Sequence, residues 1–74
     1  MDHVSEERAV EIAEEYARAE CVGEFGEILG VTREGSNWIV EFRTHTFDDV
    51  YDHRVEITAS VGNLIAHERL NRVE

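Results

Sequence analysis

Apolar residues near the start of the chain recur at the spacing of an α-helix. In the segment SEERAVEIAEEYARAECV they lie three or four positions apart, and acidic residues fill the opposite side. Ser5 is a favourable N-cap and Gly23 a typical helix stop, so the pattern predicts an amphipathic helix over about residues 5–21. The apolar side consists of Ala9, Ile12, Ala13, Tyr16 and Ala17. Its alanines form a low ridge on which a sheet can pack closely.

Beyond Gly23 the apolar period changes from about 3.6 to about 2, the period of a β-strand. In NWIVEFRTH, Trp38, Val40 and Phe42 alternate with polar residues. YDHRVEIT alternates in the same way, with His53 interrupting its apolar side. The segments EGSN and TASVGN are rich in turn formers, which indicates hairpins. The predicted strands cover about residues 24–33, 37–45, 51–59 and 63–69.

One helix followed by three or four meandering strands predicts an α+β fold, with the N-terminal helix packed on one face of an antiparallel sheet. We expect residues 1–74 to form a single domain, because the chain has no proline and only 5 glycines, and therefore no linker. The segment NLIAHERLNRV also consists of good helix formers with Asn63 as an N-cap. A closing helix therefore stays open as an alternative to the fourth strand.

The predicted core is small, as is usual for a chain of 74 residues. Its large members are Tyr16, Phe25, Leu29, Trp38, Val40, Phe42 and Ile57. Domains of this size often gain burial by association, so we expect a homodimer.

The sheet face opposite the helix is expected to stay exposed. The alternation assigns a mixed-charge group of residues to it: Ile39, Glu41, Arg43, His45, Arg54, Glu56, His67 and Arg69. We therefore expect a small non-enzymatic interaction or regulatory module that binds a protein partner through this face or an edge strand. No Ser-His-Asp or Cys-His order and no Gly-rich phosphate loop is visible, so no catalytic residue and no cofactor is assigned.

The chain is strongly acidic, with 17 Asp and Glu residues against 7 arginines and no lysine, and its formal net charge is −10. Such a field repels phosphate backbones and anionic headgroups, which argues against nucleic acid and membrane partners. An acidic, lysine-free chain is typical of proteins from molar salt, where the Debye length falls to about 3 Å, so we expect a halophilic origin. The start MDHVSEERAV lacks the features of a signal peptide. Cys21, the single cysteine, has no internal disulfide partner. Both observations favour a cytoplasmic location.

The segment HTFDDVYDH concentrates residue types that bind divalent metals. Its weak candidate ligands are His45, Asp49, Asp52 and His53. Their spacing matches neither an EF-hand loop nor a helical His pair, and a solvated acidic loop explains the same residues. A metal-binding or hydrolytic protein centred on His45, Asp49 and His53 is therefore kept as an alternative function.

The order of AVEIAEEYARAE, EILGVTRE, WIVEFR and HRVEITASVGNLI resembles the PepSY domain, a small cystatin-like module. In that family the last hairpin carries an Asp-Ala pair and a Thr-Gly turn, where this chain has Thr58-Ala59 and Val61-Gly62. The resemblance implies a binding or inhibitory module and supplies no catalytic residues.

A narrower resemblance covers GVTREGSNWIVEF and DDVYDHRVEITASVGNLIAHERLNRV. These segments are similar to the C-terminal half of the O-type gas-vesicle accessory proteins of halophilic archaea. Those proteins usually carry a longer, proline-bearing connection after the tryptophan strand, where this chain has RTHTFDDVY. The resemblance implies a second alternative, a gas-vesicle assembly factor.

Overall fold

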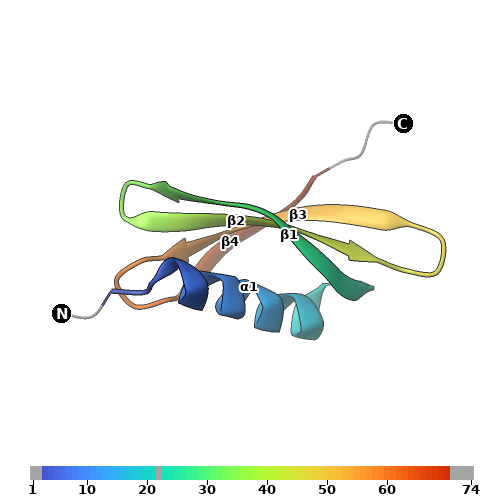
Figure 1. The fold of residues 1–74 in the computed structure, drawn as a ribbon, viewed down its shortest axis with the longest axis horizontal. Coiled ribbons are helices and arrows are strands. Elements are labelled where there is room, and N and C mark those ends of the chain that lie inside the picture. Colours follow the sequence, from blue (N-terminus) through green and yellow to red (C-terminus); the bar gives the residue numbers. More distant parts are fainter. Residues whose placement is uncertain (1–2, 22, 71–74) are drawn as a thin grey trace.

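The chain folds as one helix followed by a four-stranded antiparallel sheet, which confirms the predicted α+β class (Figure 1). This computed structural model describes residues 3–21 and 23–70. Helix α1 spans Glu6–Glu20, and strands β1 to β4 span Glu24–Glu34, Asn37–His45, Val50–Thr58 and Leu64–Leu70. The strands lie side by side in chain order. Each of these bounds lies within one residue of the span predicted for it.

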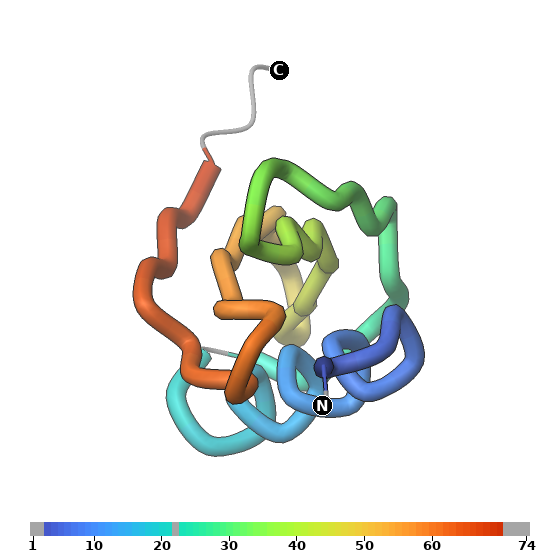
Figure 2. The backbone as a smooth tube through the Cα atoms, turned by 90° about the vertical axis from the view of Figure 1, so that its left-hand side faces the viewer, coloured from blue at the N-terminus to red at the C-terminus, as the bar shows by residue number. Residues whose placement is uncertain are grey.

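The helix lies along one face of the sheet, and the β2–β3 hairpin extends past the C-terminal end of α1 (Figure 1). Seen end-on, the curved sheet carries β1 and β4 to opposite sides, and α1 lies between them on the open side (Figure 2). The face turned away from α1 is therefore not covered by another element of the described chain.

Helix α1 begins and ends at the residues that its sequence favours. The Ser5 hydroxyl accepts a hydrogen bond from the Arg8 backbone N–H at 3.1 Å, which confirms the predicted N-cap. At the other end Cys21 is the C-cap, and its N–H donates to the Ala17 carbonyl at 3.1 Å. Gly23 follows with φ +86°, where a Cβ would lie 2.6 Å from the His45 carbonyl oxygen. In the described part of the chain, no helix combines the length and apolar character needed to cross a membrane.

The core lies between the alanine ridge of α1 and the middle strands. Its buried apolar members are Ala9, Ala13, Ala17, Val40, Phe42, Val55 and Ile57. Three more residues of the predicted core, Tyr16, Phe25 and Trp38, are partly buried and pack against this cluster. The small side chains at the ridge allow α1 to approach β2 closely.

Strand β1 departs from the predicted alternation, and Leu29 is the residue affected. It is 41% exposed, although the alternation placed it in the core. The register with β2 shifts twice, which leaves Gly26 and Leu29 as extra residues of two β-bulges. Because each bulge reverses the face on which the following residues lie, Ile28 rather than Leu29 lies opposite Phe42 and packs on the core.

The last described segment is strand β4, so the alternative of a closing helix does not hold for residues 64–70. Residues 71–73 of that alternative lie outside the described residues. The register with β3 shifts between Leu64, opposite Ile57, and Ala66, opposite Glu56. Ile65 is therefore the extra residue of a third bulge, and from this point on the faces of β4 are the reverse of a strict alternation.

Candidate functional site

The uncovered sheet face contains a hollow of about 310 Å³, which we call the outer hollow. It is lined by Glu34, Ile39, Arg54, Val55, Glu56, Ala66, His67 and Glu68. Antiparallel pairing places Ile39, Glu56 and Ala66 in one row across β2, β3 and β4. Ile39 is only 7% exposed although it lies on the uncovered face, so the hollow combines an apolar floor with a charged rim.

The rim of the outer hollow carries more carboxylates than cations. Glu34, Glu56 and Glu68 line it together with a single arginine, Arg54. In the register of the sheet, Arg54 lies between Glu41 and Glu68, so carboxylates flank its charge on both sides. The hollow is therefore a site of net negative charge.

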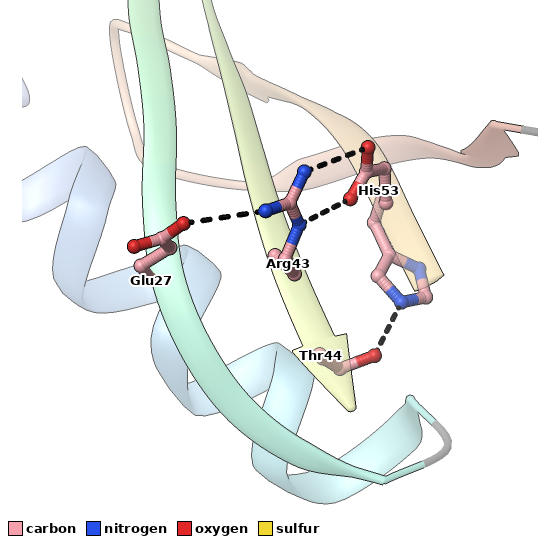
Figure 3. Close-up of polar contacts among 5 residues, drawn as sticks. Glu27, Arg43, Thr44 and His53 are labelled. Carbon is pink, nitrogen blue, oxygen red and sulfur yellow. Dashed lines mark hydrogen bonds and ion pairs between the residues drawn. The ribbon is translucent and has the colours of Figure 1, made fainter. Parts of the chain in front are cut away.

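The other arginine of this face, Arg43, is held by carboxylates away from the hollow. Its Nε donates to Asp52 Oδ1 at 2.8 Å, and its two terminal nitrogens lie 3.5 Å from Asp52 Oδ2 and from Glu27 Oε2 (Figure 3). The hydrogen bond to Asp52 and the two nearby carboxylates raise the pKa of Arg43 above its usual value. Arg43 therefore links β1, β2 and β3 through its contacts with the two carboxylates, and its charge is already paired.

The structure divides the predicted binding residues between the two faces. On the uncovered face lie Ile39, Glu41, Arg43, His45, Arg54 and Glu56. By contrast, His67 pairs with Val55, and Arg69 pairs with the buried His53. Directly paired residues share a face, so both turn toward the helix side, where the Arg69 guanidinium lies 5.2 Å from the Tyr51 ring centre. The Ile65 bulge is the reason for this correction.

On the helix side, a chain of polar side chains crosses from β2 to α1, and we call it the histidine cluster. Its members are Tyr16, Cys21, Thr44, His53 and His67. His53 is 1% exposed and stacks on Phe42, with ring centres 5.0 Å apart. Its Nε2 lies 2.9 Å from the Thr44 hydroxyl (Figure 3). Thr44 and His53 therefore form a buried polar pair next to the apolar core.

His67 connects the buried half of the cluster to the helix. Its Nε2 lies 3.0 Å from His53 Nδ1 and 3.8 Å from the Cys21 sulfur. Its Nδ1 lies 3.0 Å from the Tyr16 hydroxyl. Burial lowers the pKa of His53, and the nearby His67 and Arg69 lower it further. Burial also raises the pKa of the Cys21 thiol and of Tyr16, so the environment favours the neutral form of each of these three groups.

The predicted ligands in HTFDDVYDH are not brought together. His53 is buried on the helix side, whereas Asp52 lies on the opposite face beside Arg43. His45 is exposed at the end of β2. Asp49 lies in the following turn, where its backbone N–H donates to the Thr46 hydroxyl at 3.1 Å. Alternating neighbours in a strand point to opposite faces, so a site centred on this loop is not formed.

Two members of the histidine cluster escaped sequence reasoning for different reasons. Cys21 has no base next to it in the sequence, so its local context predicts only a thiol without a disulfide partner. His67 was assigned to the other face, because the bulge leaves no clear mark in the sequence. The useful signal was His53, which interrupts an otherwise apolar strand face.

Comparisons of the chain with protein-family models, with curated proteins and with solved structures give no match. The resemblances to the PepSY domain and to the O-type gas-vesicle accessory proteins therefore stay predictions.

Proposed function

We propose that the protein is a non-enzymatic interaction module, and that the outer hollow binds a lysine- or arginine-bearing segment of a protein partner. One observation carries this proposal: Glu34, Glu56 and Glu68 surround an apolar floor on a sheet face that no described element covers. Long cationic side chains suit such a site, because they bury their aliphatic stems while their charged heads reach carboxylates.

The charge of the whole chain supports a cationic partner. A formal net charge of −10 attracts basic segments over long range and speeds their encounter. The rim carboxylates then act at short range, where they can hydrogen-bond an ammonium or guanidinium group. At about 310 Å³ the hollow is comparable with the smaller ligand pockets of proteins, which run from about 300 to about 1,000 Å³, so it suits one or two side chains.

The proposal includes the environment expected from the sequence, the cytoplasm of a halophile. No carboxylate side chain of the described residues is buried, which fits a surface adapted to strong salt. A reducing cytoplasm would also keep the Cys21 thiol free. Homodimer formation belongs to the same proposal, since β1 and β4 are edge strands and β4 exposes Ile65.

The test is an NMR titration with a short, unstructured peptide that alternates arginine and glycine. We expect amide shifts at Ile39, Glu56 and Ala66, which form the central row of the hollow. An otherwise identical peptide with glutamate in place of arginine should cause none. Shifts confined to α1, or no shifts at millimolar peptide, would contradict the proposal.

A pair of double variants separates the hollow from general charge attraction. Glu56→Gln with Glu68→Gln removes two rim charges, whereas Glu7→Gln with Glu15→Gln removes two exposed charges of α1. We expect the first pair to weaken peptide binding about three- to fivefold, on the scale of one or two exposed ion pairs. The second pair should leave the affinity nearly unchanged. Equal losses in both would show that the whole-chain field alone attracts the peptide.

A further inference from the structure

Three side chains from three separate elements lie close together beside the core, on the helix side of the sheet. Cys21 caps α1, His53 belongs to β3 and His67 to β4. The Cys21 sulfur, one nitrogen of His53 and one of His67 all lie within 4.8 Å of one another. Thiolate and imidazole are the donors that zinc and related transition metals prefer.

We infer that Cys21, His53 and His67 form a binding site for a divalent transition metal ion of the zinc type. The donor atoms lie on the helix side of the sheet, and of the three residues only His67 also lines the outer hollow. The inference does not rest on the function proposed for the hollow. Three protein ligands leave one position of a tetrahedral ion for water or another small ligand. His67 is exposed and Cys21 is partly exposed, so an ion can reach the site from solvent.

Two of the three distances between the donor atoms are close to those around a tetrahedral ion. Zn–S bonds of about 2.3 Å and Zn–N bonds of about 2.0–2.1 Å place neighbouring ligand atoms about 3.3–3.6 Å apart. His53 Nδ1 and His67 Nε2 are 3.0 Å apart, and Cys21 Sγ is 3.8 Å from His67 Nε2. Shifts of a few tenths of an ångström in His67 and Cys21 would bring these two separations into that range. The Cys21 sulfur and the donor nitrogen of His53 lie within 4.8 Å of each other, so the partly exposed Cys21 side chain would also have to turn toward His53 by on the order of 1 Å.

The remaining nitrogen of each imidazole already has a partner that orients the ring. His53 Nε2 lies 2.9 Å from the Thr44 hydroxyl, and His67 Nδ1 lies 3.0 Å from the Tyr16 hydroxyl. When these two nitrogens carry the protons and donate to the hydroxyls, His53 Nδ1 and His67 Nε2 both keep a lone pair that can bind an ion. Metal-binding histidines commonly donate their other N–H in this way, which fixes the tautomer.

The metal-free geometry explains what an ion would replace. His53 Nδ1 and His67 Nε2 approach to 3.0 Å, so without a metal one of them must carry a proton and donate to the other. A metal ion takes the place of that shared proton and binds both lone pairs. Binding also requires the Cys21 thiol to lose its proton, because the thiolate is the metal ligand.

The test is a titration of the reduced chain of residues 1–74 with Co²⁺, followed by its displacement with Zn²⁺. The titration is carried out in high salt, which screens the many surface carboxylates. Binding that persists under this condition is specific to the site. We expect one equivalent of Co²⁺ to give a thiolate-to-metal charge-transfer band and the strong visible bands of a tetrahedral ion. Zn²⁺ should bleach both, and one equivalent of Zn²⁺ should raise the thermal unfolding midpoint. A wild-type chain that gives only weak octahedral bands would overturn the inference.

Variants assign the ligands. Cys21→Ser should abolish the charge-transfer band, and His67→Gln should abolish the tetrahedral visible bands. His45→Gln, on the exposed end of β2, is the matched control and should bind Co²⁺ as the wild type does. Tyr16→Phe, which keeps the ring but removes the hydroxyl beside His67, should weaken binding about tenfold, the lower end of the range for orienting partners.

Circular dichroism of each metal-free variant checks that the fold is retained. If Cys21→Ser and His67→Gln fold and still bind Co²⁺ with wild-type spectra, the ion is held elsewhere and the inference is wrong. The same conclusion follows if His45→Gln loses binding to the same extent as His67→Gln.

Discussion

The two faces of the sheet accommodate their polar side chains in opposite ways. On the uncovered face, Arg43 and Asp52 form a charged pair that water still reaches, with 33% and 17% of their side chains exposed. On the helix side, Thr44 and His53 are buried, and burial favours the neutral form of His53. When a hydrogen-bond partner is removed, water can take its place only on the uncovered face. A polar atom on the helix side therefore depends on its protein partner, and this difference predicts unequal effects for similar substitutions.

The largest effect should come from the apolar neighbour of the histidine cluster. Phe42 is fully buried and stacks on His53, so Phe42→Ala should lower the free energy of unfolding by about 3–5 kcal/mol. Urea unfolding monitored by circular dichroism measures this loss. A matched truncation on the partly exposed edge strand, Ile28→Ala, should cost clearly less, and equal losses would contradict the comparison.

The next effect isolates a single hydrogen bond on the helix side. Thr44→Val keeps the shape of the buried side chain but removes the hydroxyl beside His53 Nε2. An unsatisfied buried polar atom costs about 1–3 kcal/mol, and urea unfolding should show a loss in that range. Thr32→Val, on the exposed part of β1, is the control and should change stability by less than about 0.5 kcal/mol.

The third prediction concerns pH and again belongs to the helix side. Folding lowers the pKa of His53 below its unfolded value of about 6.5. Below that pH the unfolded chain takes up a proton that the folded chain resists, so this contribution is present above pH 6.5 and is lost as pH falls through the folded pKa.

We expect the free energy of unfolding to decrease between pH 6.5 and 5 by at most about 1.4 kcal/mol per pH unit, the limit for uptake of one proton. Urea unfolding across this interval, above the usual range of carboxylate titration, measures the slope. His53→Gln should reduce it. A slope that is unchanged in this variant would assign the pH dependence to other groups.

A smaller effect is expected from the charged pair on the uncovered face. Asp52→Asn removes the charge that holds Arg43 but leaves an oxygen that can still accept. The loss should be about 0.2–1 kcal/mol in dilute buffer, and it should shrink in molar KCl because salt screens exposed pairs. The effect of Thr44→Val should not depend on salt. A loss for Asp52→Asn that exceeds that of Thr44→Val would reverse the proposed difference between the faces.

The smallest effect tests the acidic side of α1. Glu11 and Glu15 repel each other at i, i+4, so Glu15→Gln should stabilise the protein by about 0.2–0.5 kcal/mol in dilute buffer and by nothing measurable in molar KCl. Many such pairs act together, so the thermal midpoint of the wild type should rise with KCl from about 0.1 to 2 M, as the Debye length shortens. A melt that is insensitive to KCl over this range would count against a halophilic origin.

The sequence predicted the middle of the molecule better than its edges. Strands β2 and β3 pair without a register shift, so simple alternation placed Trp38, Phe42 and Ile57 correctly. The edge strands carry bulges, and a single extra residue exchanges the two faces beyond it. The errors at Leu29 and His67 both follow from this. Glycine in a strand can mark a bulge, which fits Gly26 in β1. Isoleucine is common in regular strands, so Ile65 does not indicate the bulge in β4.

The candidate sites were predictable to different degrees for the same reason. The outer hollow is lined mainly by β3 and β4. Its Ile39, Arg54 and Glu56 were assigned to the correct face, because β2 and β3 pair without a register shift. The histidine cluster depends on where β4 is bulged and on how α1 approaches it. Such contacts join residues far apart in the chain, for example Tyr16 with His67, and no local pattern encodes them.

The bulge at Ile65 has a consequence for how such a protein can change during evolution. Deleting this one codon would remove the extra residue and leave Leu64 opposite Ile57 and Ala66 opposite Glu56, so His67 and Arg69 would stay on the helix side. A slip of one residue that places Ile65 opposite Glu56 would instead turn His67 to the uncovered face, and two ring contacts and a metal donor would leave the helix side together. A lineage can therefore lose the extra residue and keep the histidine cluster, whereas a one-residue change in the register of β4 removes the cluster without substitution of any residue that forms it.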